Sequence, residues 1–450
     1  MTTAVRIASG APANPAEGLR GEILAAAAAA GPRLGPTAQA LVLTGSVARD
    51  EATVTRTSKG WRVHGDAEFL LILPEGARPA PAAAAAARAA VARALSARAI
   101  DCPVSLHLAS RSYLRQMRPH IFGCELQVHG RVAWGQPDVL DAMPRLALSS
   151  IPPEDGWHLL SNRIIEFLEA AANASAAPDA ADLAYAAVKL GADMGASLLV
   201  AVGAFQPGYR VRQRALADWA RQPAPFRMAL PVAEIAAAVS VCTDWKLGAS
   251  AWPPPGSVRV APWIVGLAFQ LWKWELHQLA GGSPVAAAMA WADWRANWRR
   301  HAARQPLSAR LRGWMHLWRA RRAWSAPRSW GHWARIAGVA SPRLWVYRAA
   351  AELLSTCPAW CAASAHPGPE SLQPRRFEGD ASGAGAAPRG RNKRPSLAPH
   401  RAAARGLALP ECLRCLPDPI PARRVPAAAW ESQAAAIAAQ YHAYLEDTRS

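Results

Sequence analysis

Two apolar segments near the N-terminus, one ending in small residues and one headed by acidic residues, constrain the fold most. Residues 41–43 lead into Gly45 and Ser46, and about twenty residues later Asp66 and Glu68 open a second apolar run. Alternate residues of a strand face the same side, so Asp66 and Glu68 should present two carboxylates side by side. Carboxylates together with substrate phosphates are typical Mg²⁺ ligands, and a glycine allows backbone to approach a phosphate closely. The pattern predicts a site for metal-assisted phosphoryl or nucleotidyl transfer.

The Gly45-Ser46 turn, followed by a Gly-Asp-Ala-Glu sequence at the head of a hydrophobic strand, resembles the nucleotidyltransferase fold of the DNA polymerase beta superfamily. The similarity extends over residues 38–140, under a quarter of the chain. It implies a small mixed-sheet domain in which Asp66 and Glu68 bind Mg²⁺ and serve as the catalytic carboxylates. It also implies that Gly45 and Ser46 contact the phosphates of a nucleoside triphosphate.

Two positions differ from the pattern of that superfamily. The second carboxylate there is usually Asp, and the longer Glu68 would shift a bound metal ion. The third carboxylate, which belongs on a later strand and helps to deprotonate the acceptor, has no clear counterpart, because that segment carries Ser105 and His107. Asp101 and Glu125 are the nearest acidic candidates.

Strand-forming and helix-forming segments alternate at first and then give way to helices. Strands are expected at 40–44, 66–73, 103–108 and 125–132, with an alanine-rich helix before the third. We therefore predict an α+β fold, in which a small mixed-sheet domain is followed by a mainly α-helical region. Lys189 and Asp193, four residues apart on an expected helix, have the spacing of an ion pair. The expected divisions are a nucleotidyltransferase-like domain at 18–140, a helical domain at 150–280, a Trp/Arg-rich helical module at 285–360, a flexible linker at 364–425 and a C-terminal helix at 427–446.

The chain is strongly basic, and the charge is concentrated in its C-terminal half. The net charge is +19, from 51 Lys and Arg residues against 32 Asp and Glu residues. Residues 291–348 contain thirteen Arg and a single acid, Asp293. A field of this kind attracts polyanions, so nucleic acid is a candidate partner for this half.

Tryptophans recur at helical spacing in the same basic segment: Trp291, Trp294, Trp298, Trp314 and Trp318. They could stack on the bases of a single-stranded nucleic acid, with neighbouring arginines on the phosphates. Alternatively, they could form the core of a small helical bundle whose arginines face water. We favour the core interpretation, because this spacing places the tryptophans along one stripe of a helix.

Nothing in the sequence indicates secretion or a transmembrane segment. Residues 1–18 lack the apolar stretch of a signal peptide, and the longest apolar runs are too short to cross a bilayer. Seven Cys, an odd number without a secretory context, favour reduced thiols in a cytoplasmic protein. Zinc binding by the pairs Cys357/Cys361 and Cys412/Cys415 is disfavoured, because a Pro/Gly/Arg-rich segment separates them.

Three functions are compatible with these features. The first is a Mg²⁺-dependent nucleotidyltransferase that moves a nucleoside monophosphate from an NTP to an unidentified acceptor, with Asp66 and Glu68 as its catalytic and metal-binding residues. The second is a degenerate nucleotidyltransferase-like protein that binds nucleotide or a partner without turnover. The third is a basic nucleic-acid-binding protein that uses the C-terminal half. We favour the first, because two acids at the head of a buried strand need a metal ion or a partner to be tolerated.

Overall fold

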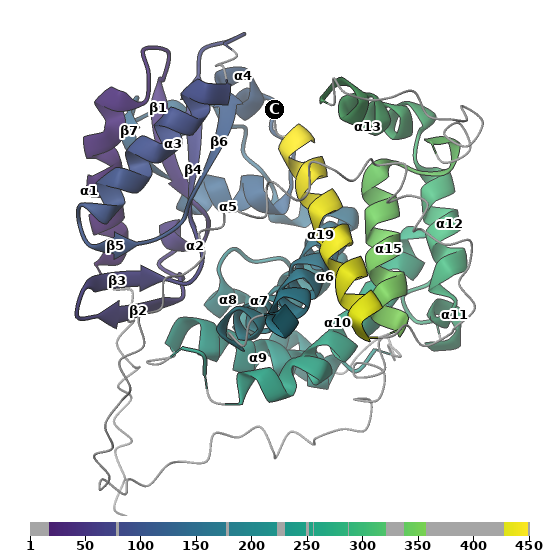
Figure 1. Cartoon of the computed structure of the whole chain (residues 1–450). Helices are drawn as coiled ribbons and strands as arrows, with labels where there is room; N and C mark the ends of the chain where they lie inside the picture. Colours follow the sequence, from purple (N-terminus) through teal and green to yellow (C-terminus); the bar gives the residue numbers. More distant parts are fainter. Residues whose placement is uncertain are drawn as a thin grey trace, which may run out of the picture.

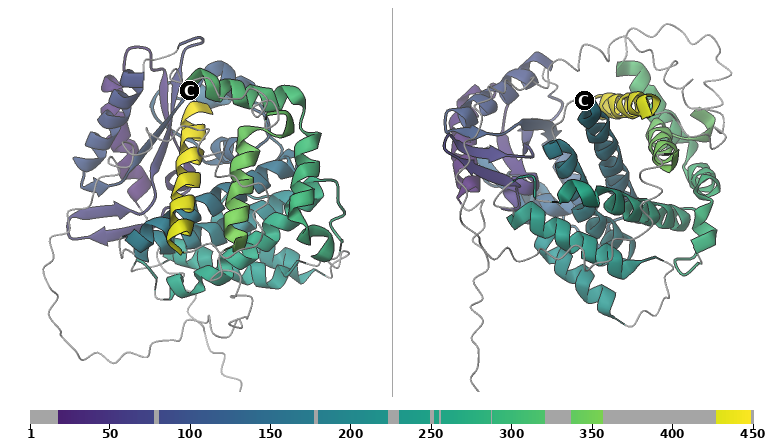
Figure 2. Two further views of the ribbon diagram at one scale, coloured as in Figure 1. Left: turned by 45° about the vertical axis from the view of Figure 1, so that its right-hand side comes forward. Right: turned by 60° about the horizontal axis from the view of Figure 1, so that its bottom comes forward.

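The structure, a computed structural model, shows an N-terminal unit that contains the described strands, followed by helices that extend to residue 448 (Figures 1 and 2). The α+β fold predicted from the sequence is therefore confirmed. The linker expected at 364–425 and both cysteine pairs lie outside the described residues. The described residues are 18–77, 81–176, 180–222, 230–248, 252–254, 256–286, 288–320, 337–356 and 427–448.

A mixed four-stranded sheet forms the centre of the N-terminal unit. Its strands are β1 (Ala40–Thr44), β4 (Ala67–Leu73), β6 (Val104–Ser110) and β7 (Arg131–Gly135). They lie in the order β6-β4-β1-β7, with β4 parallel to β6 and β1 antiparallel to both β4 and β7. Every residue of β1 is buried, because the strand has a neighbour along each edge and helices over both faces.

The helices that cover this sheet are α1 (Leu19–Ala30), α3 (Pro81–Ser96), α4 (Arg111–Arg115) and α5 (Ile121–His129). α1 and α3 pack on the face that carries Leu41, whereas α4 and α5 pack on the face that carries Leu70. Side chains alternate along a strand, so Glu68 shares the second face with Leu70. The alternation therefore directs Glu68 toward the side of the sheet that faces α5.

A second sheet of three strands completes the N-terminal unit. β2 (Val54–Thr57) and β3 (Gly60–Val63) form an antiparallel hairpin, and β5 (Ile100–Asp101) pairs parallel with β3. Gly60 has a φ of 120° and packs directly on the carbonyl of Ala99. A side chain at this position would collide with that carbonyl, so the turn requires glycine.

The prediction of a strand at 125–132 is wrong. Residues Ile121–His129 form α5, and the last strand of the sheet begins only at Arg131. The Asp155 carboxylate accepts a hydrogen bond from the backbone N–H of Ile121 at 2.7 Å, and this bond satisfies a donor in the first turn of α5. The apolar and polar residues of this segment alternate as in a strand, but a contact from a distant residue stabilises the helix.

The helices that follow the N-terminal unit are α6 (Pro153–Ala176), α7 (Ala180–Ala201), α8 (Tyr209–Arg221), α9 (Val232–Gly248), α10 (Ser257–Leu279), α11 (Ala288–Ala292), α12 (Trp294–Arg304), α13 (Leu307–Ala320), α15 (Pro342–Thr356) and α19 (Ala427–Thr448). Buried residues of α6, α7, α8, α9, α10, α12, α15 and α19 form one hydrophobic core. Buried side chains of this core extend from Trp157 in α6 to Tyr441 in α19. In both figures α19 lies alongside α15, and it also packs on α6. The C-terminal segments are therefore part of the same helical body as residues 150–280.

Two tryptophans of the basic segment, Trp294 and Trp298, belong to this core. Trp294, Trp298 and Trp314 are buried. The indole N–H of Trp298 donates to the carbonyl of Leu344 at 3.1 Å, and that of Trp314 donates to Ala340 at 2.9 Å. A buried indole that has its hydrogen-bond partner inside the protein cannot stack on a base. These three residues therefore fit the core interpretation, whereas the side chains of Trp291 and Trp318 lie outside the described part.

One helix has the length and apolar composition of a membrane span. It covers Ala181–Ala201 within α7, and 83% of its most apolar window is buried inside the protein. Neighbouring helices already cover this surface, because α7 packs against α6, α9 and α10. The described residues therefore include no clear transmembrane segment.

We expect a pH-dependent change in stability from Glu275, which is buried in α10 with 2% of its surface exposed. One carboxyl oxygen accepts a 2.7 Å hydrogen bond from the Ser197 hydroxyl, while the other has no partner among the described residues. Burial raises the pKa of Glu275 from 4.5 to about 8. The folded state therefore holds the proton more tightly, and the free energy of unfolding should decrease by about 1.4 kcal/mol per pH unit as the pH rises between these values.

The variant Glu275→Gln should lose this dependence, because its amide does not titrate. Thermal unfolding of both proteins between pH 5 and pH 8 provides the measurement. The melting temperature of the wild type should fall more steeply with pH than that of the variant. Parallel curves would show that Glu275 is not a buried protonated acid.

Candidate functional site

A pocket between the N-terminal unit and the helices brings the sequence-predicted residues together. Its volume is about 240 Å³, and its lining includes Gly45, Ser46, Asp66 and Glu68. The facing wall comes from α6, α7, α8 and α9, and α15 contributes Arg343. Residues from both halves of the chain therefore line one cavity.

The turn after β1 requires glycine for two reasons. Gly45 has a φ of 70°, which L-residues with a side chain rarely adopt. The β1–β4 register also pairs Thr44 with Glu68, and a Cβ atom on Gly45 would lie 2.8 Å from the Glu68 carboxyl carbon. The backbone at this turn therefore lies against the carboxylate because residue 45 lacks a side chain.

The two predicted acidic residues have different surroundings. Asp66 accepts a hydrogen bond of 2.5 Å from the Ser105 hydroxyl. Burial and, to a smaller extent, the Asp66 carboxylate together raise the pKa of Glu68 to about 7, against the opposing effect of Lys189 and Arg49. Two carboxylates forced together in a buried position favour either a retained proton or a bound cation.

The position that lacks a third carboxylate is occupied by a hydroxyl. Ser105 pairs with Glu68 across the parallel β4–β6 ladder, and His107 pairs with Leu70 further along. Asp101 does not line the pocket: its side chain is 74% exposed and lies 3.6 Å from Arg62. Of the two acidic candidates named from the sequence, only Glu125 reaches the pocket.

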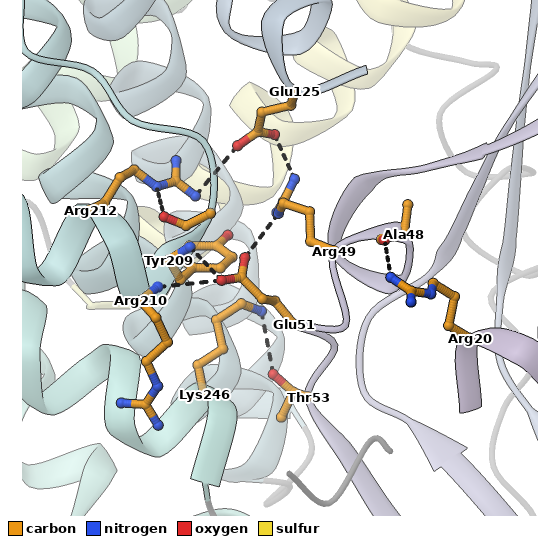
Figure 3. A network of polar contacts seen from close by, with 11 residues as sticks. Arg20, Ala48, Arg49, Glu51, Thr53, Glu125, Tyr209, Arg210, Arg212 and Lys246 are labelled. Carbon is orange, nitrogen blue, oxygen red and sulfur yellow. Dashed lines mark hydrogen bonds and ion pairs between the residues drawn. The ribbon is translucent and has the colours of Figure 1, made fainter. Parts of the chain in front are cut away.

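Glu125 belongs to a chain of alternating charges that joins the two halves of the molecule (Figure 3). The Arg49 guanidinium lies 2.6 Å from Glu125 and 3.0 Å from Glu51, and Arg212 lies 3.5 Å from Glu125. Glu51 also accepts a hydrogen bond from the backbone N–H of Tyr209 at 2.7 Å. A carboxylate of the N-terminal unit thereby caps the first turn of α8. Glu125 therefore binds two arginines, one from each half of the molecule.

The cationic wall opposite the carboxylates was not predicted from the sequence. It is formed by side chains from four separate helices: Arg163 of α6, Lys189 of α7, Arg212 of α8 and Lys246 of α9. The sequence indicated only the helical spacing of Lys189 and Asp193, and the prediction that these two residues form an ion pair is wrong. Asp193 lies 2.6 Å from Arg163, and Lys189 lies 3.1 Å from Glu166.

These ion pairs keep Arg163 and Lys189 of the wall charged. Burial alone would raise the pKa of Asp193, but Arg163 and Arg212 outweigh it and lower the pKa to about 2. Burial would likewise lower the pKa of Lys189, yet Glu166 helps to raise it above its usual value. Basic side chains with such partners stay protonated at neutral pH and can attract an anion.

The carboxylate pair provides suitable donors for a hard divalent cation. Asp66, directly before β4, and Glu68 within it offer oxygen ligands to the same pocket, and a cation would relieve the repulsion that raises the pKa of Glu68. Among the described residues, no three His, Cys, Asp or Glu side chains gather as a complete metal site. Substrate or water oxygens would therefore have to complete the coordination, as is common for Mg²⁺.

No protein-family model, curated protein or solved structure matches the chain. The functional assignment therefore depends on the geometry and chemistry of this pocket.

We predict that Arg49→Met destabilises the protein by about 3–5 kcal/mol, because it removes the cation beside Glu51 and leaves Glu125 with Arg212 alone. Adding Glu125→Gln to this variant should restore part of the loss, since one of these carboxylates becomes neutral. Urea unfolding followed by tryptophan fluorescence gives the free energies. The exposed pair of Arg115 and Glu75, with side chains 52% and 50% exposed, supplies the control, and Arg115→Met should cost less than about 1 kcal/mol. Additive losses in the double variant would contradict the role of the network.

Proposed function

We propose that this protein is a cytoplasmic Mg²⁺-dependent nucleotidyltransferase that moves a nucleoside monophosphate from an NTP to an acceptor. The observation that carries this proposal is the opposition of charges across one pocket. The carboxylates of Asp66 and Glu68 lie on one side, and a wall of Arg and Lys side chains lies on the other. A polyphosphate with bound Mg²⁺ presents both charges that such a pocket would neutralise.

Each part of the pocket has a role in this proposal. The Gly45-Ser46 turn allows the backbone to approach the phosphates, and the Ser46 hydroxyl lies in the lining beside it. Arg163 and Lys189 would hold the leaving polyphosphate in place. Asp66 and Glu68 would hold Mg²⁺, which when bound stabilises the charge that develops on the transferred phosphoryl group. These contacts orient the α-phosphorus toward the acceptor oxygen.

Ser105 favours a second candidate function, nucleotide binding without turnover. Its hydroxyl occupies the strand position where the polymerase beta superfamily carries a third carboxylate, and it donates to Asp66. A serine cannot serve as the base that deprotonates an acceptor hydroxyl. Binding and turnover must therefore be measured separately.

The nucleic-acid hypothesis gains no support from the tryptophans whose side chains the structure describes. Trp294, Trp298 and Trp314 are buried and do not provide a stacking surface. Exposed arginines on α12, such as Arg299 and Arg300, still give this side of the molecule positive charge. We therefore regard non-specific attraction of polyanions as secondary to the pocket.

The proposal predicts Mg²⁺-dependent NTP binding that requires Asp66. Each of the four common NTPs is titrated into wild type, Asp66→Asn and Asp101→Asn by calorimetry, with and without Mg²⁺. Asp66→Asn should weaken binding at least about tenfold, because it removes a charged ligand of the metal. Asp101→Asn should behave as wild type, since Asp101 is exposed outside the pocket.

Pyrophosphate release in the presence of candidate acceptors separates the two functions. Release that depends on Asp66 supports the transferase. Metal-dependent binding without release supports the nucleotide-binding alternative. If no NTP binds under either condition, both are excluded.

A further inference from the structure

Lys246 is the cation of the pocket wall that lacks an acidic partner. It is 3% exposed, and its ammonium forms no ion pair with any residue that the structure describes. Its closest polar contact is the Thr53 hydroxyl at 3.3 Å (Figure 3). The rings of Tyr185 and Tyr209 lie 5.4 Å and 5.1 Å from Nζ. A buried ammonium with only a hydroxyl and two ring faces has little to offset the loss of water.

The charged groups around Lys246 are mostly of the same sign. α7 contributes Lys189 and Asp193, α6 contributes Arg163, and the N-terminal unit contributes Arg49. The titratable phenols of Tyr185 on α7 and Tyr209 on α8 complete its surroundings. Of these charged groups, Asp193 is the one that favours the charged amine, and that carboxylate is already paired with Arg163.

These surroundings set the protonation of the amine near neutral pH. Burial, helped by the charge of Lys189, lowers the pKa of Lys246 from 10.5 to about 7. A substantial share of the molecules would therefore carry a neutral amine in the empty pocket. The other lysine of the wall does not share this property, because Glu166 lies 3.1 Å from Lys189.

We propose that Lys246 is a phosphate-binding residue that takes up a proton from solvent when a polyphosphate enters the pocket. The entering anion supplies the negative charge that the protein does not provide, and an adjacent anion favours the charged form of an amine. The neutral amine becomes an ammonium and donates to a phosphate oxygen, and the proton comes from the buffer. This inference rests on the pocket binding polyphosphate, as in the proposed function, but not on turnover.

Proton uptake makes polyphosphate affinity depend on pH. Above about pH 7 the affinity should decrease by up to about tenfold per pH unit, because the proton must be acquired from an increasingly dilute pool. Arginine at the same position would remain protonated and would bind with no such uptake. Lys246→Arg is therefore the matched variant for the experiment.

Calorimetry of inorganic triphosphate in metal-free buffer tests the proposal. Titrations at pH 6 and pH 8, each in two buffers of different ionisation enthalpy, give the number of protons taken up. The wild type should take up nearly one more proton than Lys246→Arg at pH 8, and the difference should shrink at pH 6. Proton exchange by the ligand itself cancels in this comparison, because the same ligand binds both proteins.

Two further variants show whether a change is specific to Lys246. Lys59→Arg, at an exposed position in the β2–β3 turn, should match the wild type. Lys246→Met should weaken triphosphate binding at pH 6 by at least about tenfold, because the cation is lost. Thermal unfolding and circular dichroism confirm that each variant is folded before its binding is compared.

The outcomes distinguish this inference from the proposed function. The inference is overturned if wild type and Lys246→Arg take up equal numbers of protons at pH 8. It is also overturned if triphosphate does not bind to wild type at either pH 6 or pH 8. Mg²⁺-dependent nucleotidyl transfer could still be observed in either case. Conversely, proton-linked triphosphate binding without nucleotidyl transfer supports the role of Lys246 and contradicts the proposed transferase function.

Discussion

The guanidinium of Arg49 connects the parts of the molecule that form the pocket. Arg49 lies directly after the short helix that Gly45 begins, and its guanidinium contacts Glu51 and Glu125. Glu51 in turn binds the N-terminus of α8, and Glu125 contacts Arg212 on the same helix. The position of the Gly45-Ser46 turn is therefore coupled to the position of the cationic wall. A pocket lined by both the N-terminal unit and the helices depends on contacts of this kind, because neither part contains all of its lining residues.

Opposite charges meet across the pocket, yet they are not simply paired with one another. Each basic residue of the wall except Lys246 has an acidic partner among its helical neighbours or in α5. The carboxylates of Asp66 and Glu68 are balanced mainly at a distance, and burial keeps the pKa of Glu68 near 7. This arrangement leaves one uncompensated acidic pair and one uncompensated amine facing the same cavity. Such groups are expected where a ligand supplies the missing charges.

The local pattern of the sequence was sufficient to predict the acidic half of the pocket. The position of Gly45, Asp66 and Glu68 follows from a turn and from the alternation of a strand, which depend on neighbouring residues only. The cationic wall depends on how four helices pack, and nothing in the sequence around Arg163 or Lys246 specifies that they meet. For the same reason Asp193 was assigned to the wrong partner. Helical spacing made Lys189 available to it, but tertiary packing brought Arg163 closer.

The basic C-terminal half is part of the structure around the pocket. Arg343 of α15 lines the cavity, and its Nε donates to the Tyr347 hydroxyl at 2.7 Å. That hydroxyl donates in turn to Asn162 of α6, which also lines the pocket. Arg348 of the same helix lies over the buried ring of Trp298, at 4.9 Å from its centroid. Some of the arginines that made this half resemble a nucleic-acid surface thus support the core and the pocket. Net charge counted along the sequence therefore overstates the charge that a polyanion would meet on the surface.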